Sequence, residues 1–226
     1  MESTGMLRTD FRSAMADLED RILLLGRTAQ QMVGTAMTAL EATSPELCAG
    51  VVASDDALDQ DAYALNEDLY ALLTLQGPVA TDLRLLLSLQ KVLGSIERIG
   101  DRSLNIARLG ADLAGIDDGS TDLRAQMHEL GRRAERAVRM GLDSFSHRRS
   151  DMAFVSTVED QIDLLHGGLT GRLIDYASTG PSQTRWAMRM LLASHQLERI
   201  GDHAVTIAGE GAFVATGQRP PPRSRL

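Results

Sequence analysis

The sequence predicts an all-α protein in which a unit of three helices occurs twice. Three observations lead to this prediction. The stretches between prolines are rich in good helix formers, apolar residues recur with a helical period, and one motif recurs at a constant offset. Hydrophobic residues make up 43% of the 226 residues, which is enough for a folded core and argues against global disorder.

The first half of the chain predicts three helices. In the first, apolar residues alternate steps of four and three, a pattern that suits packing at shallow angles: Phe11, Met15, Leu18, Ile22, Leu25, Ala29, Met32, Ala36 and Ala39. Ser44 and Pro45 are a suitable N-cap and first turn for the second helix, which extends to about Gln76. After the Gly77-Pro78 break, the third helix is predicted over about 79–114.

The second half repeats this order. After a turn at 115–120, helices are predicted over about 121–147, 151–178 and 182–216, and Gly180-Pro181 breaks the chain as Gly77-Pro78 does. The predicted domains are two three-helix units, 6–115 and 120–217, followed by a basic, Pro-rich tail, 218–226, that is expected to be disordered.

A sequence repeat supports the duplication directly. The segment from Glu97 to Asp101, Glu-Arg-Ile-Gly-Asp, recurs from Glu198 to Asp202 at an offset of 101, and Ile106-Ala107 recurs as Ile207-Ala208. Close helix packing would explain why the repeat keeps its glycines and apolar residues. It does not explain why the acids are kept.

Acidic residues spaced four apart occur on the second and third helix of each half. Side chains at i and i+4 share a helix face, and in an antiparallel hairpin the start of one helix meets the end of the next. Each hairpin is therefore expected to gather four carboxylates, and clustered oxygen ligands suit Mg²⁺, Mn²⁺ or iron. The predicted ligands are Asp55, Asp59, Glu97 and Asp101, extended by Asn105, and Glu159, Asp163, Glu198 and Asp202. Thr206 stands where the first half has Asn105.

Other interpretations of these acids stay open. They could form a solvated face or ordinary surface ion pairs, with Arg84, Arg98, Arg102 and Arg199 as partners. A metal-dependent enzyme and a metal-free helical scaffold are the alternative functions. The Glu-x-x-His signature of di-iron proteins, a phosphate-binding loop and G-x-S-x-G are absent from the sequence. His166, His195 and His203 lie near the acids but are interpreted as surface or packed residues.

The charge is distributed unevenly. The net charge is −8, which argues against nucleic-acid binding. From Thr28 to Leu83 there are nine acidic residues and no Lys, Arg or His, so solvent, Arg from another element or metal cations must balance them. The second cluster lies in a more balanced half and is predicted to bind metal more weakly.

The cysteine count and the distribution of apolar residues indicate a compartment. Cys48 is the only cysteine, which rules out an intramolecular disulfide and suits the reducing cytosol. We expect neither a signal peptide nor a transmembrane helix, because no apolar run approaches the roughly 20 residues that a span needs.

These motifs together resemble the PhoU family of phosphate-transport accessory and regulatory proteins. The similarity rests on the doubled Glu-Arg-Ile-Gly-Asp motif, on the acid pairs of the second and fifth helices, and on Pro78-Val79-Ala80-Thr81-Asp82-Leu83-Arg84, and it spans about 7–217. The second half departs from the pattern at Thr206 and at 181–185.

The resemblance implies a PhoU-like fold, similar to spectrin repeats, of two antiparallel three-helix bundles related by a pseudo-two-fold. It implies metal clusters of iron, zinc, magnesium or manganese on the acid motifs, a homodimer, and a cytoplasmic location peripheral to membrane complexes. It also implies a non-enzymatic role in phosphate homeostasis. That role is negative regulation of phosphate uptake and of the starvation response, by contact with the phosphate ABC transporter ATPase and a phosphate-responsive sensor histidine kinase.

Overall fold

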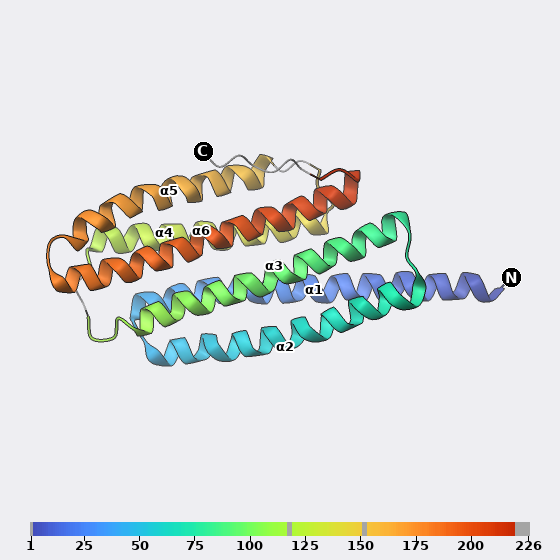
Figure 1. The fold of residues 1–226 in the computed structure, drawn as a ribbon, viewed down its shortest axis with the longest axis horizontal. Coiled ribbons are helices and arrows are strands. Elements are labelled where there is room, and N and C mark those ends of the chain that lie inside the picture. The colour runs from blue at the N-terminus through green and yellow to red at the C-terminus, as the bar shows by residue number, and fades with distance from the viewer. Residues whose placement is uncertain (1, 117–118, 151–152, 220–226) are drawn as a thin grey trace.

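The computed structural model describes residues 2–116, 119–150 and 153–219, and every regular element in these ranges is an α-helix (Figure 1). The helices are α1 (Glu2–Ala42), α2 (Pro45–Gln76), α3 (Ala80–Ala111), α4 (Thr121–Ser146), α5 (Ala153–Ala177) and α6 (Pro181–Thr216). Helices α1, α2 and α3 pack against one another as one antiparallel bundle, and α4, α5 and α6 form a second. The predicted fold class is confirmed.

Local sequence signals place the helix ends. Ser44 caps α2 by accepting a hydrogen bond from the Leu47 N–H at 3.2 Å, and Pro45 occupies the first turn. Gly77 ends α2 in the left-handed conformation, with φ of 51°. Helix α3 ends three residues earlier than predicted, because from Leu113 onward the backbone N–H groups bond to the carbonyl three residues back.

Two glycines at equivalent positions let helices of one bundle touch through their backbones. A Cβ on Gly110 of α3 would lie 2.5 Å from the Leu40 Cα of α1, and one on Gly211 of α6 would lie 2.7 Å from the Phe145 Cα of α4. Neither contact leaves room for a side chain. The first and third helices of each bundle therefore pack closely through a glycine at the equivalent position.

The bundles meet along α3 and α6, with a second contact between α1 and α4 (Figure 1). Helices α3 and α6 run antiparallel, and polar links join them along their length: Ser88–Glu210 at 2.9 Å, Arg102–Gln196 at 3.0 Å and Arg189–Asp112 at 3.2 Å. Glu210 is buried and also accepts hydrogen bonds from Lys91 at 3.2 Å and from Arg219. Both bundles therefore contribute to one charged contact.

The chain after Arg219 lies outside the described residues, so most of the predicted disordered tail, 218–226, falls there. Among the helices that the structure describes, none is both long enough and apolar enough to span a bilayer.

Candidate functional site

The hairpin of α2 and α3 brings each of the first four predicted carboxylates within electrostatic range of at least one acid on the other helix. Burial, followed by the charges of Asp59 and Asp101, raises the pKa of Asp55 to about 6. Burial and the charge of Asp101 raise the pKa of Asp59, and burial and the charge of Asp59 raise that of Glu97. Asn105 lies one turn beyond Asp101 on α3 and is half-buried. The acids thus oppose one another's ionisation, which a bound cation would relieve.

Asp55 is the most constrained of the four. Its side chain is only 5% exposed, and its Oδ1 atom is buried without a hydrogen bond. Gly100 of α3 makes the space for it, since a Cβ there would lie 3.0 Å from Oδ1. Arg108 lowers its pKa but does not cancel the effect of burial. A buried carboxylate oxygen with no donor is suited to a proton or a metal ion.

The donor set of the first cluster fits a hard cation, because it consists of carboxylate oxygens and one amide. In the described part of the chain, however, no three His, Cys, Asp or Glu side chains already surround a single point. Binding would therefore require side chains to rotate toward the ion.

The hairpin of α5 and α6 carries the second set of acids, but their neighbours differ. Glu159 is buried, as Asp55 is. Arg199 Nη1 lies 2.6 Å from Asp202 Oδ2, and His195 Nδ1 lies 3.3 Å from Glu198 Oε2. Thr206 donates its hydroxyl to the Asp202 carbonyl of its own helix at 3.0 Å. Cationic and imidazole groups thus accompany the acids in this half.

Sequence reasoning missed one arrangement in the second half. His166 of α5 and His195 of α6 lie with their ring centres 6.2 Å apart, although 29 positions separate them in the chain. A signal was present, because Asp163 with His166 and His195 with Glu198 are both i, i+3 pairs. His203 is not part of this arrangement. Burial, Arg102, Arg199 and Arg98 lower its pKa, and the charge of Asp202 raises it.

The arginines expected to balance the acids do so only in part. Arg98 lies 3.6 Å from Asp101, a longer pair than the one between Arg199 and Asp202. Arg102 instead donates to Gln196, and Arg84 lies over the Phe213 ring at 5.6 Å, because the packing of α3 on α6 places both away from the carboxylates.

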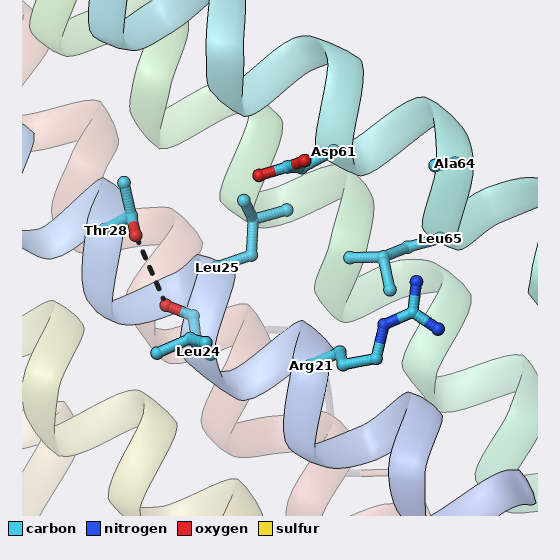
Figure 2. A pocket seen from close by; sticks show the side chains of 7 residues that line it. All are labelled: Arg21, Leu24, Leu25, Thr28, Asp61, Ala64 and Leu65. Carbon is cyan, nitrogen blue, oxygen red and sulfur yellow. Dashed lines mark hydrogen bonds between the residues drawn. The ribbon is translucent and has the colours of Figure 1, made fainter.

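A counter-charge for the acidic segment also comes from α1, as the expectation of an arginine from another element allows. Arg21 donates to Asp68 of α2 at 2.8 Å. The same arginine lines a groove of about 250 Å³ between α1 and α2, as Asp61 does (Figure 2). The groove is otherwise mostly aliphatic, and none of the nine predicted ligands lines it.

The fold and the carboxylates define a class: duplicated helical-bundle proteins in which paired helices of each bundle carry clustered acids. The model of the PhoU domain matches residues 22–110 and 127–210. The chain belongs to the PhoU family.

Relatives and solved structures align with this chain over nearly its whole length. The chain is 26% identical to a phosphate-specific transport system accessory protein PhoU homolog of Clostridium acetobutylicum, covering 95% of this chain and 98% of that one. It is 27% identical to the homolog of Pseudomonas aeruginosa, covering 95% of this chain and 88% of that one. The crystal structure of PhoU from Pseudomonas aeruginosa superposes with a TM-score of 0.86 at 27% identity, covering 92% of this chain and all of that one. The phosphate transport system regulatory protein PhoU from Streptococcus pneumoniae shares the fold, with a TM-score of 0.85, 22% identity, and coverage of 94% of this chain and all of that one.

Proposed function

We propose that this chain is a non-enzymatic, cytoplasmic accessory protein of a phosphate-specific transport system, and that it lowers phosphate uptake and represses the starvation response. The observation that carries the proposal is the match of the PhoU domain to both halves, joined by relatives of that name that align over 95% of the chain. Its proposed partners are the transporter ATPase and a phosphate-responsive sensor histidine kinase, and its proposed state is a homodimer.

The carboxylate clusters are proposed to bind metal ions, with Fe, Zn, Mg and Mn as the candidates, and to order the helix hairpins that present a docking surface. Support comes from the first cluster. Asp55 is buried with an oxygen that lacks a hydrogen bond, and burial, followed by the charges of the acids around it, raises its pKa. A cation bound to Asp55, Asp59, Glu97 and Asp101 would remove this repulsion and fasten α2 to α3.

The proposal is tested in a strain that lacks the chromosomal gene for this chain and carries a reporter of the starvation response. Wild-type protein should restore repression in high phosphate, and pull-downs in high and low phosphate should recover the transporter ATPase or the sensor kinase. Recovery of neither partner, or failure to repress the reporter, would contradict the regulatory role.

Variants test whether the regulatory role depends on the carboxylate clusters. Asp55→Ala with Asp101→Ala should impair repression and reduce metal content, whereas Asp61→Ala should do neither, because Asp61 lies on α2 facing α1. Phosphatase or oxidase turnover that disappears in Asp101→Ala would show that the protein is an enzyme.

A further inference from the structure

A second hollow continues the groove between α1 and α2 that Figure 2 shows. The first hollow has a volume of about 250 Å³ and the second about 290 Å³, and Arg21 lines both. Together they follow α1 from Ala14 to Thr28, which is about 21 Å, or four turns, at 1.5 Å per residue. The groove is therefore long enough to hold a further helix of about 14 residues.

The lining of this groove suits helix packing. Leucines and alanines make up most of it: Leu18, Leu24, Leu25, Leu65 and Leu72, with Ala14, Ala64 and Ala71. Leu24 is 61% exposed and the three alanines are also exposed, so this apolar surface is open to a partner. Because the distance between packed helices is set by the side chains at the contact, alanines allow a further helix to approach closely.

Carboxylates border the groove. Asp17 of α1 and Asp61 and Asp68 of α2 line it, and Arg21 is the basic residue among the described residues that do so. Arg21 lies 2.8 Å from Asp68 and 3.5 Å from Asp17, whereas Asp61 forms no ion pair within the part of the chain that the structure describes. Further exposed acids of α2 are Asp56, Asp59 and Glu67. An apolar floor is thus combined with a negative border.

The corresponding groove of the second bundle has a different charge. It lies between α4 and α5, has a volume of about 390 Å³ and also contains leucines. Arg133 and Arg172 line it together with Gln126 and Gln161, and the described residues around it include no acid. Each bundle therefore keeps an apolar groove at its second helix, but a basic partner would meet attraction at the first and repulsion at the other.

We propose that the groove between α1 and α2 is a docking surface for a basic amphipathic helix of a partner protein. The apolar face of that helix packs between α1 and α2, and its Lys or Arg side chains pair with Asp17, Asp61 and Asp68. In recognition of this kind the apolar face supplies contact area, while the charges select the partner and its orientation. None of the nine predicted metal ligands lines the groove, and docking here goes beyond the proposed regulatory role and does not depend on it.

The test uses the full chain and two synthetic fluorescein-labelled helices of about 18 residues. The basic probe carries Leu along one face and Lys on both flanks, and the acidic probe carries Glu in place of each Lys. Fluorescence anisotropy should show that the basic probe binds, with an affinity that falls as salt is added, and that the acidic probe does not bind. Failure of the basic probe to bind at low salt would overturn the proposal.

Charge reversal inside and outside the groove provides matched variants. Asp61→Lys/Asp68→Lys should weaken binding of the basic probe at least about tenfold. Asp20→Lys/Glu67→Lys changes the net charge by the same amount at exposed acids that do not line the groove, and it should weaken binding less than about threefold. Equal losses would show that overall acidity attracts the probe, and would overturn the proposal. Circular dichroism checks that each variant is folded.

Two further variants test the contacts separately. Leu24→Ser should weaken binding about tenfold, and Leu164→Ser, its matched control at a 79% exposed leucine of the other groove, should leave it unchanged. Arg21→Ala frees the carboxylates of Asp17 and Asp68 and should strengthen binding up to about fivefold. Binding that Leu24→Ser leaves unchanged would overturn the proposal.

Other occupants of the groove give distinct results. Self-association of the chain that Asp61→Lys/Asp68→Lys abolishes in sedimentation would assign the groove to a second copy. Binding of the basic probe that appears only after residues 220–226 are removed would assign it to the basic tail of the chain itself. Either result would overturn the proposal. The reporter of the starvation response is a separate readout, so this proposal and the regulatory one fail separately.

Discussion

The two bundles keep the same spacing of acids but place different groups beside them. In the first, Asp55 lies against Gly100, and burial, followed by the charges of nearby acids, raises the pKa of Asp55 and of Asp59. In the second, Gly201 faces the aliphatic side chain of Ile162, and Arg199 pairs with Asp202 at 2.6 Å. Duplication has kept the backbone positions and has changed how the charge is balanced. The chemistry of each site therefore depends on its neighbours more than on the acid-xxx-Asp pattern.

The largest expected loss of stability should be common to both halves of the chain. Gly110→Ala and Gly211→Ala should each lower the free energy of unfolding by more than about 2 kcal/mol, because the new Cβ meets backbone atoms of the facing helix, which cannot rotate away. Urea unfolding measures this. Gly50→Ala and Gly171→Ala are matched controls, where a Cβ meets nothing within 4 Å, and each should gain up to about 1 kcal/mol. A large loss in only one half would break the equivalence of the bundles.

Added metal ions should distinguish the two halves of the chain by their effect on the stability of the folded protein. Mn²⁺ or Mg²⁺ at about 100 times its dissociation constant should stabilise the folded protein by roughly 2.7 kcal/mol through the α2–α3 cluster. Thermal unfolding with and without metal measures the gain. Asp55→Asn and Glu97→Gln should abolish it, whereas Asp202→Asn, whose partner is Arg199, should retain most of it. Equal losses in all three variants would show that the two clusters bind these cations alike.

The metal-free protein should show the penalty of ionising Asp55. Its pKa is about 6 when folded and near the ordinary 3.8 when unfolded, so folding favours the protonated form. Stability from this group is complete below pH 3.8 and is lost as the pH rises through 6. Asp55→Asn should therefore raise the free energy of unfolding at pH 7.5 by about 1–3 kcal/mol, with no gain at pH 3.5. Chelator-treated protein, unfolded in urea at each pH, provides the measurement, and a variant less stable than wild type at pH 7.5 would refute the expectation.

The smallest difference concerns the two equivalent arginines. Arg199→Gln should cost about 1 kcal/mol, because its 2.6 Å pair with Asp202 is partly shielded, with side chains 33% and 17% exposed. Arg98→Gln should cost less than about 0.5 kcal/mol, because its 3.6 Å pair with Asp101 lies in solvent. Double-mutant cycles with the two aspartates measure both energies, and equal values would show that solvent exposure does not distinguish the pairs.

Local signals in the sequence predicted most of the fold. Ser44 before Pro45 and the glycine at 77 act within a few residues, so their effect can be predicted without knowing the tertiary structure. Helical spacing likewise predicted that acids of α2 and α3 would come within range of each other, as Asp55 does with Asp101 and Asp59 with Glu97.

The contacts that could not be predicted depend on how each helix is oriented about its axis and packed against the others. Arg102 bonds Gln196 because α3 meets α6, a contact between bundles that no periodicity within either helix specifies. His166 meets His195 for a similar reason, since the rotation of α5 about its axis decides which side chain faces α6. Contacts of this kind follow from packing across long sequence separations.

The position of His203 has a consequence for the contact between the bundles. Burial lowers its pKa, and so do Arg98 and Arg102 of the first bundle and Arg199 of the second. Two of these arginines also pair with a cluster aspartate, Arg98 with Asp101 and Arg199 with Asp202. Burial and these arginines therefore favour the neutral His203 ring at the contact between the bundles, so the ring does not add to the positive charge there.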